Sequence, residues 1–310
     1  MNMDDLSAKL DDFDHFYNDE LKPLLESLET KRKEAYSTFI KVVIGVMVIF
    51  ITIAILLKNI DQMVFVAVPA FLIVGYFYRK MAIFRAQAKH MIMPEICTRL
   101  GMTYHQKPRN NATQMFRTLS LIPSYDEKKL EDEVRGCIDD VDFNLFEAKL
   151  INVSRDSKGR TTRNTVFKGL LANFDFHKNF VGTTVVSGDL TALGNFLTGW
   201  AKGGDRVKLE DPEFESKFEV HSTDQVEARY LLTPSLMERI LKFSNMANVK
   251  GLELAFHDRH LFMSIKRDKQ YFEGGGYDLD DLKYIKENIK DITFIFDIIN
   301  QLNLAQNTKI

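Results

Sequence analysis

Two apolar segments separated by only five residues constrain the fold of this chain more than any other feature. The first, VVIGVMVIFITIAILL, covers residues 42–57, and the second, MVFVAVPAFLIVGYFY, covers residues 63–78. Neither contains a charge, and each is close to the ~17–25 residues that a helix needs to cross a bilayer. The connection KNIDQ can join only antiparallel neighbours. We therefore expect a helical hairpin with two membrane spans, at about residues 39–58 and 61–78.

Basic side chains on one side of this hairpin set its expected orientation. They precede the first segment and follow the second, at Lys31, Arg32, Lys33, Lys41, Arg79, Lys80, Arg85 and Lys89. Lys and Arg are enriched in the cytoplasmic segments of membrane proteins. The sequence thus predicts a multi-pass membrane protein whose N- and C-termini both lie in the cytoplasm.

The hairpin divides the chain into four predicted parts. These are a cytoplasmic amphipathic helical arm (1–35), the transmembrane hairpin (36–80), a cytoplasmic helical connector (81–140) and a cytoplasmic α+β domain (141–310). Apolar residues recur in the arm at steps of three and four, as they do on one face of a helix, at Leu6, Leu10, Phe13, Phe16 or Tyr17, Leu21, Leu24 and Leu28. This face can pack against the chain's own domain, or it can form a short coiled seam between copies.

The connector begins as a continuation of the second apolar helix. Pro94 can open a further turn, and Gly101 has the position of a helix C-cap. The segment NNATQ (110–114) is expected to be a loop. The charged segment DEKKLEDEVRG (126–136) is expected to be a short exposed helix that ends at Gly136.

Beyond Val141 the apolar pattern changes to the alternation of half-buried strands. Strands are expected at 143–153, 161–176 and 182–190, arranged as an antiparallel meander, and two more are expected as a hairpin, 252–258 and 261–267, around Asp258 and Arg259. A long helix is expected from about Leu279 to the end of the chain. The fold class is therefore α+β: an N-terminal amphipathic helix, the hairpin, and an antiparallel β domain with flanking helices and a long C-terminal helix.

Seven carboxylates gather in LEDPEFESKFEVHSTDQVEARYLLTP, residues 209–234. Asp211-Pro212 and Thr233-Pro234 each combine an N-capping residue with proline at the first helical position. Between these helix starts, FEVHS and QVEARYLL are interpreted as strands around a turn at Thr223–Asp224. On a strand, Glu227 and Arg229 would share one face, and we regard both as candidates for contact with a partner.

The only tryptophan lies in LTALGNFLTGWAKGG, residues 190–204. At helical spacing, one apolar face would carry Leu193, Phe196, Leu197 and Trp200. Two interpretations remain open for this face. It either packs in the core of the domain, or it is an exposed wedge that contacts a membrane or a partner.

Few patterns in the sequence point to chemistry. The net charge of −2 argues against a nucleic-acid-binding protein. Two lone cysteines fit a reducing compartment, and His257 and His260 flank a predicted turn rather than form a metal motif. No phosphate-binding or nucleophile motif occurs. We therefore predict no catalytic residue, no cofactor-binding residue and no metal ligand.

Two segments resemble a known family. VKLEDPEFESKFEVHSTDQVEARYLLTPSLMERI (207–240) and VFKGLLANFDFHKNFVGTTVV (166–186) resemble the signature of a bacterial, membrane-anchored family designated domain of unknown function 3137. The resemblance covers most of the chain from about residue 30. It implies the inner membrane of a bacterium as the location, and a LemA-type membrane-anchored protein as a partner. The activity of that family is unknown, so the resemblance assigns no catalytic residue.

These observations support a non-enzymatic, inner-membrane-anchored protein whose cytoplasmic domain mediates self-assembly, as a homo-oligomer, or partner binding in the cell envelope. One alternative is a membrane-tethered module that binds a lipid or a peptide. Another is a membrane-tethered hydrolase that uses carboxylates of residues 209–234, with Glu210, Glu219 and Glu227 as the first candidates.

Overall fold

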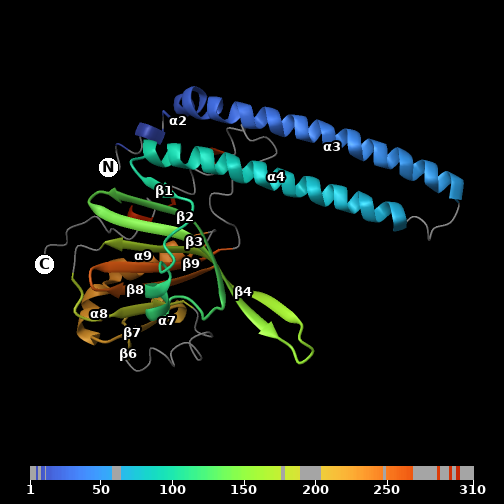
Figure 1. Ribbon diagram of the computed structural model, residues 1–310. Coiled ribbons are helices and arrows are strands. Elements are labelled where there is room, and N and C mark those ends of the chain that lie inside the picture. The colour runs from blue at the N-terminus through green and yellow to red at the C-terminus, as the bar shows by residue number, and fades with distance from the viewer. Residues whose placement is uncertain are drawn as a thin grey trace. The chain divides into compact units, whose positions relative to one another are not determined.

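A large antiparallel sheet with flanking helices makes the chain an α+β protein (Figure 1). The computed structural model describes residues 5, 8–10, 12–57, 64–175, 179–188, 204–246, 249–267, 285–286, 293–294 and 298–300. The chain forms two compact units, one built mainly from residues 96–271 and the other mainly from residues 11–95. The α+β fold class is confirmed by the sheet and its helices.

Within the described residues, nine strands form the sheet, in the order β1-β2-β3-β4-β9-β8-β5-β7-β6. They are β1 Thr103–His105, β2 Glu127–Ile138, β3 Val141–Arg155, β4 Thr161–Asp175, β5 Thr184–Ser187, β6 Asp205–Val207, β7 Glu219–Ser222, β8 Gly251–His257 and β9 His260–Lys266. The helices described are α2 Phe13–Phe16, the π-helix η1 Tyr17–Leu21, α3 Lys22–Leu57, α4 Val64–Arg99, α5 Gln114–Thr118, α7 Pro212–Lys217, α8 Gln225–Leu231 and α9 Pro234–Ser244.

Two of the predicted strand pairs are correct, and the pair predicted between 161–176 and 182–190 is wrong. β3 pairs with β4, and β8 pairs with β9 across the predicted turn, where Asp258 has a φ of 53°. The meander fails at β5, which pairs with β7 and β8, while β4 pairs with β9. The central strand β9 buries Leu261, Met263 and Ile265 on one face and Phe262 on the other, so burial of this apolar strand on both faces decides the order.

The segment expected as an exposed helix at 126–136 is part of strand β2, so that prediction is wrong. β2 pairs with β3 along its length, and a bulge between Glu131 and Val134 breaks the alternation that would have marked a strand. Asp139 and Asp140 have φ values of 47° and 63°. Positive φ at both central residues is typical of a two-residue hairpin turn, and this turn aligns β2 with β3.

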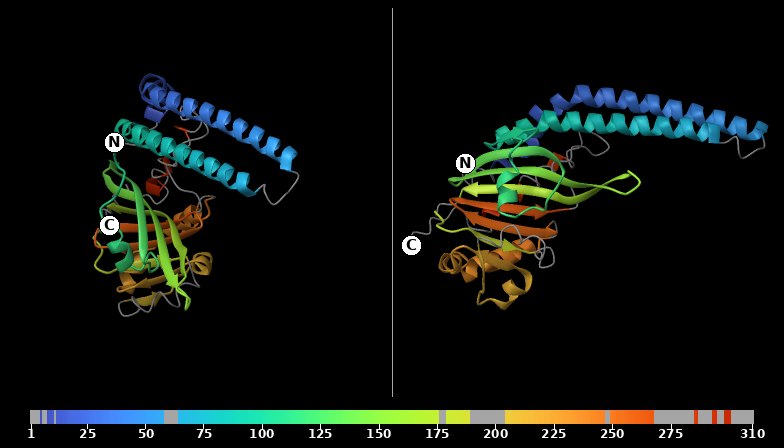
Figure 2. Two further views of the ribbon diagram at one scale, coloured as in Figure 1. Left: turned by 45° about the vertical axis from the view of Figure 1, so that its right-hand side comes forward. Right: turned by 60° about the horizontal axis from the view of Figure 1, so that its bottom comes forward.

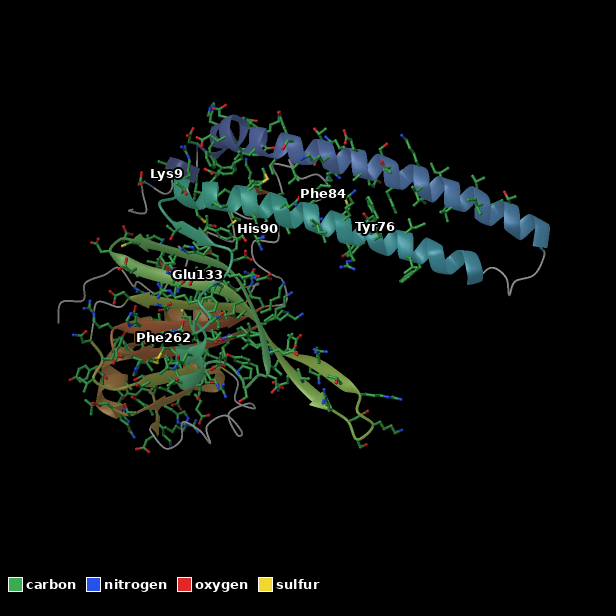
Figure 3. All side chains as sticks on the ribbon, viewed as in Figure 1. Lys9, Tyr76, Phe84, His90, Glu133 and Phe262 are labelled. Atoms are coloured by element: carbon green, nitrogen blue, oxygen red, sulfur yellow. The ribbon has the colours of Figure 1, made fainter. Side chains whose placement is uncertain are left out.

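The two faces of the sheet differ in what they bury. Because successive strand residues point to opposite faces, Leu261, Met263 and Ile265 of β9 lie on one face and Phe262 lies on the other. The second face carries a core cluster with α5 and the residues after it, in which Phe116 makes edge contacts with Phe146 and Phe262. We call this the α5 face; Figure 3 labels Phe262 upon it.

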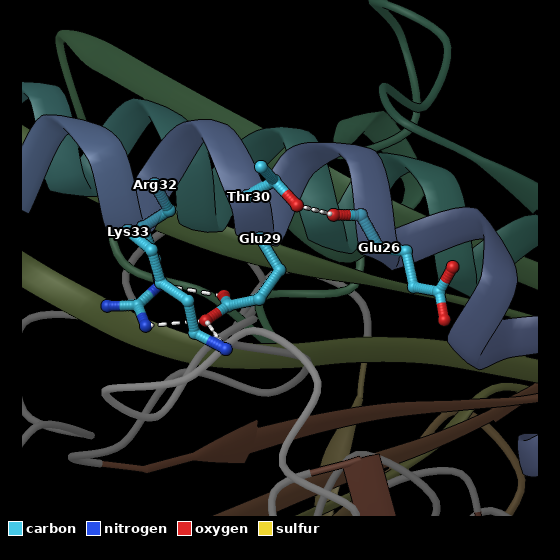
Figure 4. Close-up of polar contacts among 5 residues, drawn as sticks. All are labelled: Glu26, Glu29, Thr30, Arg32 and Lys33. Atoms are coloured by element: carbon cyan, nitrogen blue, oxygen red, sulfur yellow. Dashed lines mark hydrogen bonds and ion pairs between the residues drawn. The ribbon is translucent and has the colours of Figure 1, made fainter.

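The helical unit has α3 and α4 running side by side (Figures 1 and 2). The rings of Phe39 and Phe77 stack with centroids 3.7 Å apart. In α3, Arg32 donates two hydrogen bonds to the carboxylate of Glu29, at 2.7 and 2.6 Å, and both side chains are buried (Figure 4). α4 ends at Arg99, and Gly101, which has a φ of 69°, follows it as the predicted C-cap, where Met102 N–H donates to Cys97 O as a C-terminal capping bond.

The N-terminal arm is helical, as expected, but its buried face differs from the predicted one. Lys22 N–H donates to Tyr17 O, the i→i−5 bond of the π-helix η1. This extra residue in one turn shifts the phase of the apolar face. Leu25 is therefore fully buried, whereas the predicted Leu24 is 40% exposed.

The predicted membrane spans require a correction. Within the described residues, no helix is long and apolar enough to cross a membrane. The transmembrane hairpin predicted with spans at 39–58 and 61–78 is therefore unsupported, and the predicted multi-pass location in the inner membrane is contradicted. Each apolar run covers only sixteen residues between charged neighbours, Lys41 before the first and Arg79 after the second, short of the ~20 that a span needs. The predicted connection 58–62 lies outside the described residues.

Candidate functional site

Exposed apolar side chains cover much of α3 and α4, where Figure 3 labels Tyr76. We define the α3–α4 apolar surface by its exposed large residues, which are Ile40, Val42, Ile44, Met47, Val48, Ile49 and Ile51 on α3 and Phe71, Leu72, Val74, Tyr76, Tyr78 and Ile83 on α4. Met47 is 62% exposed and Phe71 is 79% exposed. Monomeric soluble proteins rarely expose large contiguous apolar patches, and such patches mark interaction sites.

The acidic stretch 209–234 consists largely of helix caps, as predicted. Asp211 accepts hydrogen bonds from the backbone N–H groups of Glu213 and Phe214 and starts α7. Thr233 accepts from Leu236 N–H and starts α9. Glu215 accepts from Leu209 N–H at 2.7 Å. The carboxylates of Asp211 and Glu215 therefore bind backbone N–H groups of their own segment.

Residues 225–231 form helix α8, so the prediction of a strand there is wrong. Asp224 caps the helix by accepting from the N–H groups of Val226 and Glu227, both at 2.9 Å. The sequence contained the signal, since Asp followed three residues later by Glu is typical of a helix start. Arg229 is exposed and bonds to Gln225 one turn away, so it does not share a strand face with Glu227.

Glu227 binds backbone from a distant part of the chain. Its two carboxylate oxygens accept hydrogen bonds from Val181 N–H at 2.9 Å and from Gly182 N–H at 2.8 Å. Charge-assisted hydrogen bonds of this kind are about twice as strong as neutral ones. Glu227 therefore joins the start of α8 to the segment before β5, and this contact could not be read from the residues around it.

A hydroxyl, an imidazole and a carboxylate meet beside this segment. Thr183 Oγ1 lies 2.7 Å from His257 Nδ1, and His257 Nε2 lies 3.4 Å from Asp258 Oδ2. To act as a nucleophile, the Thr183 hydroxyl would also need N–H donors that stabilise a developing oxyanion. The neighbouring N–H groups donate elsewhere, those of Val181 and Gly182 to Glu227 and that of Thr183 to Thr223 Oγ1. The arrangement fastens β5 to β8.

His257 belongs to a row of polar residues across the α5 face. The β8–β9 register places His257 opposite His260, and the β9–β4 register places His260 opposite Asp175. Directly opposed residues of antiparallel strands lie on the same face. Asp175 Oδ1 is buried and has no hydrogen-bond partner among the described residues. Among the described residues, no group of three or more His, Cys, Asp or Glu side chains could hold a metal ion.

The three acids proposed for a hydrolase have different surroundings. Glu210 is exposed before α7, Glu219 lies 3.3 Å from Arg206 and 3.5 Å from His221, and Glu227 binds backbone. Glu219 and Glu227 therefore contact different groups, and no described contact joins any two of the three acids.

A buried polar pair lies on the other face of the sheet, at the bulge of β2. Tyr104 donates a 2.6 Å hydrogen bond to Asp132, which is 1% exposed and has a φ of 57°. Burial, then the charge of Asp132 and its hydrogen bond, raise the pKa of Tyr104 well above its ordinary value. Burial also raises the pKa of the nearby Cys97 thiol to about 12, so this thiol stays protonated. No pattern in the sequence around Tyr104 or Asp132 predicts this pair.

Several predicted elements fall outside the described part of the chain. Leu193, Phe196, Leu197 and Trp200 all belong to residues 189–203, which the structure does not describe. Both interpretations of that segment therefore stay predictions. Most of the expected C-terminal helix from Leu279 also lies outside the described residues, although Ile285, Phe294, Ile298 and Ile299 are buried.

Comparison with known proteins gives a family match and a distant structural likeness. No curated protein sequence matches the chain. One similar solved structure is that of the mycobacterial trehalose monomycolate transport factor A, TtfA, with 9% identity and a TM-score of 0.34, covering 67% of this chain and 92% of that chain. At that score the likeness supports no conclusion about this protein.

A family model matches the chain from within β4 towards the C-terminus. The model of the family "Protein of unknown function (DUF3137)" matches residues 165–304. This range contains the acidic stretch and the Glu227 contact, and the match confirms the resemblance noted in the sequence. The match does not show a bacterial source or a membrane anchor. Over residues 165–304, the chain therefore matches the DUF3137 family of proteins of unknown function.

Proposed function

We propose that this protein self-associates through the α3–α4 apolar surface and acts as a non-enzymatic assembly protein. One observation carries the proposal, namely the thirteen large apolar side chains, among those described, that form the exposed α3–α4 apolar surface. Burying one such side chain fully contributes roughly 1.5–3 kcal/mol. A surface made of many of them strongly favours association over exposure to water.

A second copy of the chain is the partner that this surface fits. The surface extends over two neighbouring helices, α3 and α4, and presents apolar residues along both. Two such hairpins can pack as a bundle of four helices, in which the inward-facing apolar side chains of each helix are buried. A two-fold axis needs the same patch on both copies, and a single chain supplies it.

The mass of the full chain in solution tests this proposal. Met47→Asp with Ile51→Asp would place two carboxylates on one face of α3 in the proposed interface, and we expect a shift from oligomer to monomer in light scattering coupled to size exclusion. Val226 and Tyr230, exposed apolar residues of α8 at 64% and 69%, supply the matched control as Val226→Asp with Tyr230→Asp. That control should keep the mass of the parent chain.

Two outcomes would count against the proposal. The parent chain could be monomeric at every concentration, or the α8 control could dissociate the oligomer as fully as the α3 variant. The LemA-type partner, lipid or peptide binding and hydrolysis stay predictions, because no contact in the described residues favours one of them.

A further inference from the structure

The hairpin of β3 and β4 extends beyond the rest of the sheet (Figures 1 and 2). The last β2 partner of β3 is Ile151, and the last β9 partner of β4 is Gly169. Between these limits, residues 152–164 pair strand against strand only with each other. We call residues 152–164 the basic ribbon. Both of its edges are without a further strand in the described part of the chain.

The basic ribbon has a charge opposite to that of the whole protein. It contains four basic side chains, Arg155, Lys158, Arg160 and Arg163, and one acid, Asp156, whereas the whole chain has a net charge of −2. Asp156 accepts hydrogen bonds from the backbone N–H groups of Lys158 and Arg160. Arg163 is engaged by Glu127 at 3.2 Å.

Three cations at the tip therefore remain available. Arg155, Lys158 and Arg160 are exposed, and no ion pair joins them to an acid among the described residues. Charge on a sheet edge protects it from pairing with other edges, but either sign would do this. Three neighbouring cations also make a site for an acidic partner.

The chain itself contains a matching acidic segment. Residues 1–20 include seven acids and one base. In the described part of that segment, Asp14 is paired with Lys286 at 2.6 Å and Asp5 with Lys9 at 3.4 Å. Asp19 and Glu20 are exposed on η1, and no described basic residue forms an ion pair with them.

We propose that the basic ribbon of one copy binds the acidic arm, through Asp19 and Glu20, of a second copy. This inference rests on the proposed self-association, which supplies the second arm, and a two-fold axis would let each ribbon meet the other chain's arm. Nucleic acid fits the ribbon less well. The ribbon has no aromatic side chain on which a base could stack, and the pI of 6.4 gives the chain no overall attraction for a polyanion.

A charge swap between two full-length chains tests the contact. The ribbon-reversed chain carries Arg155→Glu, Lys158→Glu and Arg160→Glu, and the arm-reversed chain carries Asp19→Lys and Glu20→Lys. Alone, each would oppose like charges at both contacts of a symmetric dimer, and we expect self-association to weaken roughly tenfold or more at low salt. An equimolar mixture restores opposite charges at both contacts, so the heterodimer should regain the parent affinity. Differently tagged chains and sedimentation velocity would measure it.

Controls separate this inference from the proposed function. Lys208→Glu with Glu210→Lys exchanges exposed charges elsewhere in the same unit and should leave the affinity of the parent unchanged. A parent that associates while both reversed chains associate equally well would overturn the ribbon contact and leave the apolar interface standing. A parent that never associates would overturn both. Binding of labelled duplex DNA by the parent that is lost in the ribbon-reversed chain would also overturn the contact, because nucleic acid would then be the partner.

Discussion

Single carboxylates in this protein bind groups that their own sequence neighbourhood does not reveal. Glu227 is the clearest case, because both its oxygens accept N–H groups from Val181 and Gly182, about 45 residues earlier. Its role is to join two segments of the domain, whereas the sequence suggested a surface pair with Arg229. Asp132 is a second case, since its left-handed backbone and its bond to Tyr104 depend on the bulge in β2.

The Tyr104–Asp132 pair predicts how stability changes at alkaline pH. The pKa of Tyr104 is raised in the folded protein above its ordinary value of 10.0, so folding favours the protonated phenol. Stability from this group is fully present below pH ~10 and is lost as the pH rises above the pKa of the unfolded chain. We expect Tyr104→Phe to lower the free energy of unfolding at pH 7 by about 1–3 kcal/mol, and to reduce its further loss above pH ~10.

Urea unfolding at a series of pH values measures both effects. Tyr230→Phe is the matched control, since Tyr230 is 69% exposed and its hydroxyl should contribute little. Equal alkaline losses in the parent chain and in Tyr104→Phe would show that the buried phenol does not cause the dependence.

At the scale of elements, pairing between distant strands determines the sheet. β4 and β9 approach closely at Gly169, where an added Cβ would lie 2.0 Å from the carbonyl oxygen of Ile265. Gly251 pairs with Lys266 from the other side, but a Cβ there would meet only the Lys266 side chain, at 3.4 Å. Both glycines pair with Lys266, but the position of Gly251 on β8 tolerates a side chain and that of Gly169 on β4 excludes it.

These two glycines give a prediction with its own control. Gly169→Ala would force β4 and β9 apart, and we expect a loss of about 3 kcal/mol in the free energy of unfolding, at the upper end for overpacking. Gly251→Ala should change it by less than about 1 kcal/mol. Thermal or urea unfolding of the two variants compares them directly, and a Gly169→Ala chain as stable as Gly251→Ala would contradict the close approach.

At the scale of the whole molecule, the exposed apolar residues of α3 and α4 are the feature that folding within one chain leaves unsatisfied. Association then becomes part of stability, because a partner that binds only the folded chain shifts the unfolding equilibrium. The basic ribbon and the acidic arm would add orientation to that association, since charge complementarity chooses between partners more than it adds affinity.

This coupling predicts that the melting temperature depends on chain concentration. We expect the melting temperature of the parent to rise between low and high micromolar chain, as it does for an oligomer that dissociates on unfolding. The Met47→Asp, Ile51→Asp chain should melt at a temperature independent of concentration. Scanning fluorimetry over a hundredfold concentration range makes the comparison, and a parent with a constant melting temperature would speak against association.

The sequence by itself determined the features that depend on neighbours along the chain. Asp211-Pro212 and Thr233-Pro234 predicted their helix starts because a cap bonds to N–H groups two or three residues away. Alternation predicted β3, β4, β8 and β9, since a half-buried strand needs only its own period. The family signature was equally local.

Only the tertiary structure decided what depends on distant partners. β2 is a strand because β3 pairs with it, against the helical character of its charged residues. The order that places β9 beside β4, and the contact of Glu227 with Val181, join segments separated by dozens of residues or more. The apolar runs of α3 and α4 suggested membrane spans, and the described helices do not support them. Composition states how apolar a segment is, whereas the structure shows which of its side chains are left exposed, and that exposure is the basis of the proposed assembly.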